Sequence, residues 1–82
     1  MNEQLDIWVD FNTQDDTGLP WSLLDEATDQ SRIVAGAYVL AGNDHANAVA
    51  EVVDVGSDGV VHLRPLPGPI SEHRHLLGAT TR

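Results

Sequence analysis

The chain has 82 residues, no cysteine, and 13 acidic residues against four basic ones, which gives a formal net charge of −9. This length leaves room for one domain, and the lack of cysteine excludes disulfide bonds and zinc–thiolate sites. The fold must therefore be held by apolar burial. The negative charge disfavours direct binding to nucleic acid, whose phosphates require basic side chains. It favours a basic protein partner, or serves solubility alone.

The acidic residues are concentrated near the N-terminus. Residues 1–29 contain eight of them and no Lys or Arg, whereas residues 30–82 contain five together with all four arginines. If the charge has a role in binding, the surface for a cationic partner is therefore expected in the N-terminal third of the chain.

Residues 5–11 alternate strictly between apolar and other side chains, which predicts a half-buried strand. One face carries Leu5, Ile7, Val9 and Phe11. The opposite face carries Trp8 between two aspartates. A tryptophan in this position either anchors a partner or packs beneath a neighbouring loop.

Residues 12–32 are predicted to be irregular or helical. Leu23, Leu24 and Ala27 recur at helical spacing, and either Pro20 or Ser22 could begin a short helix. With its tryptophan, leucines and acids, the stretch 10–27 could present a binding surface or form a lid over an open barrel end. Its sequence, DFNTQDDTGLPWSLLDEA, resembles a block of small uncharacterised acidic actinobacterial proteins, and that resemblance implies no activity.

Residues 33–70 are predicted to form barrel strands. Short β-rich runs at 38–41, 48–55 and 60–64 are separated by glycine-containing turns, and Asp58-Gly59 is the clearest hairpin signal. Val61 and Leu63 should face inward. Residues 50–55 do not alternate cleanly, which indicates a bulge or burial on both faces.

This segment resembles the KOW type of SH3-like barrel. The residues that carry the resemblance are Gly36, Val39, Val52, Asp58, Gly59 and Val61. It implies a mainly β fold, a small five-stranded SH3-like barrel with one or two short helical turns. It also implies a KOW-like function in binding nucleic acid.

After the last strand, residues 65–69 are rich in proline and must leave regular pairing. A polyproline ligand that starts from Arg64 would require proline at position 70, where the chain has Ile70. Residues 71–78 are predicted to form a short helix with Ser71 as its N-cap and Gly78 as its stop.

No motif for catalysis, phosphate binding or cofactor binding is present, so we expect neither an enzyme nor a cofactor. A metal site at the histidines is disfavoured, because His73 and His75 would diverge by about 200° on the expected helix. We expect no signal peptide, because the first residues do not combine a basic stretch with an apolar run, and the longest apolar run, residues 33–41, is too short to span a membrane. We expect a cytoplasmic protein that is a monomer or a weak homodimer.

The sequence favours a non-catalytic module that binds a basic protein surface through tryptophans and acids. The alternatives are a nucleic-acid mimic, in which rows of carboxylates replace phosphates, and a KOW-like nucleic-acid-binding domain. The candidate interaction residues are Trp8, Asp10, Asp15, Asp16, Trp21, Asp25 and Glu26.

Overall fold

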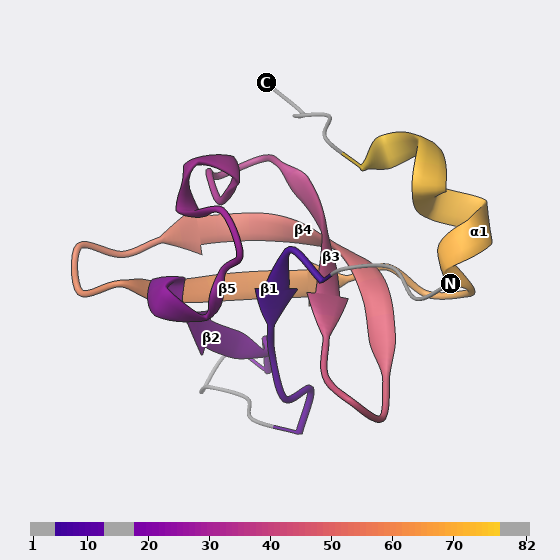
Figure 1. Ribbon diagram of the computed structural model, residues 1–82, viewed down its shortest axis with the longest axis horizontal. Helices are drawn as coiled ribbons and strands as arrows, with labels where there is room; N and C mark the ends of the chain where they lie inside the picture. The colour runs from indigo at the N-terminus through magenta and orange to yellow at the C-terminus, as the bar shows by residue number, and fades with distance from the viewer. Residues whose placement is uncertain (1–4, 13–17, 78–82) are drawn as a thin grey trace.

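The computed structural model describes residues 5–12 and 18–77. Within these residues it contains five strands: β1 (Ile7–Trp8), β2 (Trp21–Leu23), β3 (Tyr38–Gly42), β4 (Asn47–Val55) and β5 (Val60–Pro65). They form one sheet in the order β1-β3-β4-β5-β2, which curls into a nearly closed barrel (Figure 1). The predicted fold class, a small five-stranded, mainly β barrel with short helical turns, is confirmed.

Strands β3, β4 and β5 form an antiparallel meander, as predicted. At the β4–β5 turn, Gly59 has a positive φ of 84°, and the backbone N–H of Gly56 donates to Val60 at 2.9 Å. Glycine adopts that φ without a steric cost, which explains the hairpin signal of Asp58-Gly59. The register of β4 on β5 shifts between Val52 and Asp54, an irregularity at the place where the sequence predicted a bulge or burial on both faces.

Strand β1 pairs in parallel with β3, which the sequence did not indicate. Its alternation was interpreted correctly, because Ile7 and Val9 are fully buried while Trp8 is 45% exposed. The predicted strand over 5–11 was too long, since regular pairing covers two residues. The Asp10 carboxylate accepts a hydrogen bond from the Asn12 backbone N–H at 2.9 Å, which turns the chain away from the sheet.

The segment predicted to be irregular or helical, residues 12–32, contains a strand that the sequence analysis missed. Residues of β2 pair antiparallel with β5, with Ser22 opposite Val61. Two short 3₁₀ helices follow, η1 (Leu24–Glu26) and η2 (Gln30–Arg32). Ser22 is therefore not a helix cap, and residues 21–23 belong to the barrel wall rather than to a lid. Pairing with the open edge of β5 outweighs the local helical spacing.

The barrel closes at a seam, which we define as the junction between β1 and residues 21–28. No ladder joins β1 to β2, but Ile7 forms an antiparallel bridge with Ala27, and Thr28 N–H donates to the Asp6 carbonyl at 2.9 Å. The Ser22 hydroxyl also donates to the Trp8 carbonyl at 2.5 Å. A few hydrogen bonds from three short segments thus replace the missing ladder.

The core is apolar and draws on every strand except β2, whose inward residue is Ser22. Val61 and Leu63 face inward, as predicted. The fully or almost fully buried hydrophobic residues are Ile7, Val9, Ile33, Ala37, Val39, Leu40, Ala41, Val49, Ala50, Val52, Val61 and Leu63.

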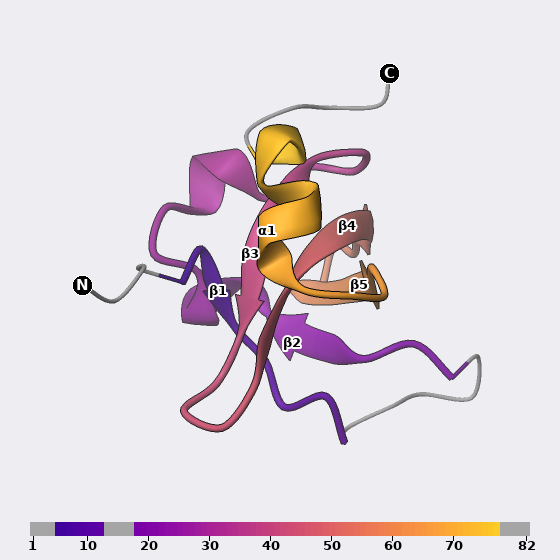
Figure 2. The same ribbon diagram turned by 90° about the vertical axis from the view of Figure 1, so that its right-hand side faces the viewer.

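The last elements of the described chain form a helical segment, α1 (Ile70–His73) followed by η3 (Arg74–Leu76). It lies against one end of the barrel, beside β4 (Figure 2). The helix was predicted over 71–78 with Ser71 as N-cap, but Pro69 occupies the N-cap position, because its extended backbone leads directly into the first turn. Gly78 lies outside the described residues. None of the helices in the described ranges is long and apolar enough to cross a membrane.

Candidate functional site

A pocket of about 170 Å³ opens over the seam on the outside of the barrel. Both tryptophans of the chain line it. Its full lining is Trp8, Asp10, Trp21, Ser22, Leu23 and Glu26. We refer to it as the seam pocket.

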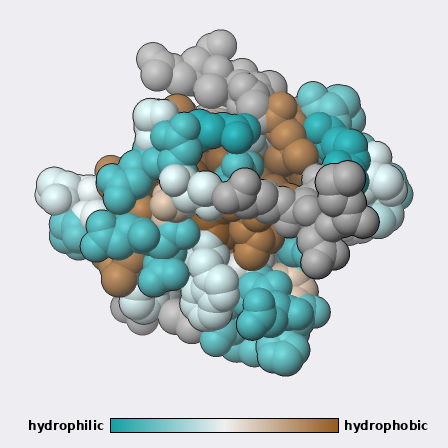
Figure 3. All heavy atoms as spheres, viewed as in Figure 1, coloured by the Kyte–Doolittle hydropathy of each residue, from teal (hydrophilic) through white to brown (hydrophobic). Residues whose placement is uncertain are grey.

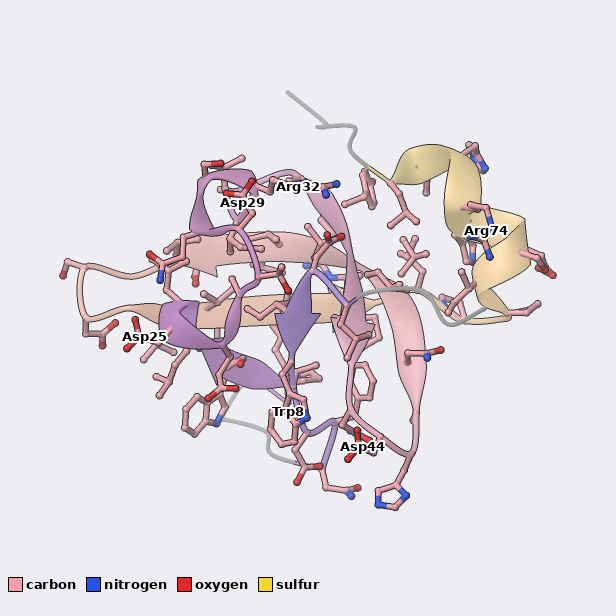
Figure 4. The ribbon with its side chains drawn as sticks, in the orientation of Figure 1. Trp8, Asp25, Asp29, Arg32, Asp44 and Arg74 are labelled. Atoms are coloured by element: carbon pink, nitrogen blue, oxygen red, sulfur yellow. The ribbon has the colours of Figure 1, made fainter. Side chains whose placement is uncertain are left out.

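Side chains along the two edge strands alternate between the core and the outer surface, and this alternation directs the lining residues outward. Inward-facing Ile7 and Val9 force Trp8 and Asp10 outward on the β1 side, and buried Ser22 places Trp21 and Leu23 outward on β2. The hydrogen bond from Ser22 to the Trp8 carbonyl holds the two sides together beneath the pocket. Figure 4 shows Trp8 below the end of β1 and Asp25 farther to the left, beside η1.

The structure brings together four of the seven residues predicted for interaction: Trp8, Asp10, Trp21 and Glu26. Asp25 instead lines a neighbouring hollow of about 260 Å³ with Leu23, Leu24, Asp58 and Gly59. Asp15 and Asp16 lie outside the described residues.

Sequence reasoning missed Leu23 and Ser22 as parts of the site. Leu23 was assigned to a helix, whereas it is 45% exposed on the outer face of β2 and lies between the two hollows. Residues 21–23 carry no periodic signal that could have found them, because three residues are too few to distinguish a strand from the start of a helix.

Every charged side chain that lines the seam pocket is acidic. One oxygen of Asp10 already accepts the Asn12 N–H, which fixes the position of the carboxylate. Glu26 is exposed and has no hydrogen-bond partner among the described residues. The pocket therefore has one fixed negative charge and one adaptable negative charge beside its two indole rings.

The described arginines do not line the pocket. Arg32 pairs with Asp6 at 3.1 Å, and Arg64 pairs with Glu51 at 3.0 Å. Arg74 lies in the C-terminal helical segment, at the right-hand end of the view in Figure 4 and away from Trp8. No positive group of the described chain therefore neutralises the two carboxylates of the seam pocket.

Several other acids have roles within the fold. The Asp29 carboxylate accepts hydrogen bonds from the hydroxyl and the backbone N–H of Ser31, at 2.6 and 3.0 Å. These bonds, with a smaller contribution from the nearby Arg32 guanidinium, lower the pKa of Asp29 below its ordinary value. Asp58 accepts the Val60 N–H at 3.0 Å in the β4–β5 turn. The net charge therefore overstates the number of carboxylates that are available to a partner.

The described residues do not form a metal-ligand cluster or an activated serine nucleophile. They include no group of three or more His, Cys, Asp or Glu side chains that could bind a metal ion. The hydroxyl of Ser22, at the floor of the pocket, donates to a backbone carbonyl rather than facing a general base. The arrangement is suited to binding a cation between aromatic rings and carboxylates.

Comparison of the chain with protein-family models, with curated proteins and with solved structures finds no match. The resemblances to KOW-type barrels and to small actinobacterial proteins therefore stay predictions. The function is inferred from the geometry of the seam pocket.

Proposed function

We propose that the protein is a non-catalytic interaction module that binds a basic partner protein through the seam pocket. The observation that carries this proposal is the meeting of Trp8 and Trp21 with Asp10 and Glu26 in one hollow. An indole face attracts a cation, and adjacent carboxylates accept hydrogen bonds from its N–H groups. A lysine or arginine side chain of the partner supplies both features.

The surroundings of the pocket support the same partner chemistry. Figure 3 shows a small hydrophobic patch at the left-hand end of this face, over the end of β2, with hydrophilic residues around it. A partly exposed tryptophan with a polar rim is typical of the centre of a protein interface. The excess of acid in residues 1–29 adds a longer-range attraction for a basic surface.

The other two functions fit the described residues less well. A nucleic-acid mimic requires rows of free carboxylates, yet Asp6, Asp29 and Asp58 are bound within the fold. Direct nucleic-acid binding requires converging basic groups, yet Arg32 and Arg64 are paired with acids.

The proposal is tested by titrating the protein with a capped peptide of about six arginines, at about 50 and about 300 mM salt. The two tryptophans are the only ones in the chain, so their intrinsic fluorescence reports directly on the pocket. We expect a saturable change that weakens at higher salt and is absent with a glutamine peptide of equal length.

Variants at the pocket distinguish specific binding of the peptide from its non-specific electrostatic attraction to the acidic protein. Trp8→Leu removes an indole and should weaken binding by about twofold to thirtyfold, which corresponds to a cation–π contribution of about 0.5–2 kcal/mol. Glu26→Gln should weaken it as well. Glu72→Gln removes one exposed acid on α1, at the far end of the barrel, and is the matched control for charge (Figure 1). Equal effects of Glu26→Gln and Glu72→Gln, or no fluorescence change with arginine, would contradict the proposal.

A further inference from the structure

The seam pocket has a neighbour that the proposed function does not use. This second hollow, of about 260 Å³, lies beside the β4–β5 turn and is lined by Leu23, Leu24, Asp25, Asp58 and Gly59. Leu23 is the residue that lines both hollows. The two hollows therefore lie on either side of one exposed leucine.

The chemistry of the second hollow matches that of the first. Its charged lining residues are again acidic, and Asp25 is exposed without a hydrogen-bond partner among the described residues. One oxygen of Asp58 accepts the Val60 N–H, which fixes this carboxylate as Asp10 is fixed in the seam pocket. Leu23 and Leu24 supply apolar area, which the aliphatic stem of a lysine or arginine can cover.

Three features together define one docking surface: the seam pocket, the exposed Leu23 and the second hollow. Among the described residues, only three large hydrophobic side chains are exposed, and two of them, Trp8 and Leu23, lie on this surface. The negative charge on both sides of an apolar centre is complementary to a segment that carries positive charge on both sides of its contact with Leu23.

We propose that the partner docks as an extended basic segment with two cationic side chains, one on each side of Leu23. The first, an arginine, enters the seam pocket, where its planar guanidinium stacks on an indole and bonds to a carboxylate. The second enters the hollow between Asp25 and Asp58. This inference rests on the proposed function of the seam pocket and adds a two-site specificity to it.

The test compares capped peptides of about ten residues, made of Gly and Ser, that carry either one arginine or two. In the two-arginine series the second arginine is placed two, three or four residues after the first. An extended chain advances about 3.3 Å per residue, so these spacings sample different separations between the two arginines. Binding is followed by the fluorescence of Trp8 and Trp21. We expect at least one spacing to bind about fivefold or more tightly than the single-arginine peptide.

Variants of the second hollow locate the origin of that gain. Asp25→Asn and Asp58→Asn should each remove most of it, while they lower affinity for the single-arginine peptide no more than Glu72→Gln does. Asp58→Asn keeps a side-chain oxygen for the Val60 N–H, so the turn is preserved. Glu72→Gln is again the distant control and should retain the full gain.

The outcomes distinguish this inference from the proposed function. If the single-arginine peptide binds and no spacing improves on it, the two-site inference is overturned and the seam pocket stands. If Glu72→Gln reduces the gain as much as Asp25→Asn does, the gain comes from net charge, and the inference is equally overturned. If neither the single-arginine peptide nor any of the two-arginine peptides binds at low salt, both proposals are overturned.

Discussion

Strands β3, β4 and β5 bury their apolar side chains along continuous antiparallel ladders, whereas the seam joins two short strands by a few hydrogen bonds. The meander contributes Leu63, Val61 and Val52 to the core, each fully buried. The seam instead exposes Trp8 and Leu23. Stability is therefore concentrated in the meander, whereas the proposed recognition surface lies at the seam, so a substitution should remove one property without the other.

The largest difference in the free energy of unfolding is expected between Leu63→Ala and Trp8→Leu. Leu63 is fully buried on the central part of β5, so its truncation should lower the free energy of unfolding by about 2–5 kcal/mol. Trp8 is 45% exposed, so Trp8→Leu should cost less than about 1 kcal/mol while it weakens arginine binding. Urea denaturation of both variants measures the difference. Similar losses would mean that the seam is as important to stability as the meander.

A second contrast concerns the backbone at the end of β3. A Cβ on Gly42 would lie 2.6 Å from the Cα of Asn47, and backbone atoms cannot move aside easily. Gly42→Ala should therefore destabilise the fold by about 1–3 kcal/mol. The control is Gly56→Ala, where a Cβ would meet the carboxylate oxygen of Asp58 at 2.6 Å, and that side chain can rotate away at the cost of its hydrogen bond from the Val60 N–H. Thermal unfolding should rank Gly42→Ala well below Gly56→Ala in stability.

Asp6 tests how firmly β1 is held beside β3. Its carboxylate accepts the backbone N–H of Leu40 at 2.8 Å and pairs with Arg32 at 3.1 Å, and its side chain is 16% exposed. Asp6→Ala leaves the Leu40 N–H without that acceptor and should cost about 1–3 kcal/mol. Arg32→Gln removes only the exposed ion pair and should cost at most about 1 kcal/mol. If the two variants unfold at the same denaturant concentration, the ion pair and not the backbone bond holds β1.

The smallest effect should come from Asp29, which caps η2. Its pKa is lowered by the Ser31 hydroxyl and backbone N–H, so NMR titration should place it below the ordinary value of about 3.9. Ser31→Ala should raise it. Because the folded-state pKa is the lower one, the stabilisation is present above the ordinary pKa and is lost as the pH falls through the folded-state pKa. An unchanged pKa in Ser31→Ala would contradict this account.

The sequence predicted the meander well because its signals are local. Asp58-Gly59 between β-branched runs specifies a hairpin, and the turn sets the register of β4 on β5 up to the shift at Asp54. The alternation of Ile7 and Val9 also predicted correctly which face of β1 is buried, and hence that Trp8 lies on the outer face.

The seam could not be predicted in the same way. Three residues, Trp21, Ser22 and Leu23, are too few for a periodic pattern, and the following residues also fit a helix. What makes them a strand is the open edge of β5, which is distant in sequence. The residue types of the site were predicted from composition and charge. Their convergence in one pocket depends on how β1 and β2 meet, and no local signal encodes that meeting.

The parallel pairing of β1 with β3 has a consequence for the order of folding. Asp6 and Leu40 are 34 residues apart in sequence, whereas the hairpins of the meander join near neighbours. Closing a longer loop costs more chain entropy, so the meander should form before β1 docks and the seam closes. Trp8 and Trp21 then come together in the last step, and their fluorescence would register completion of the barrel later than amide protection in β4 and β5.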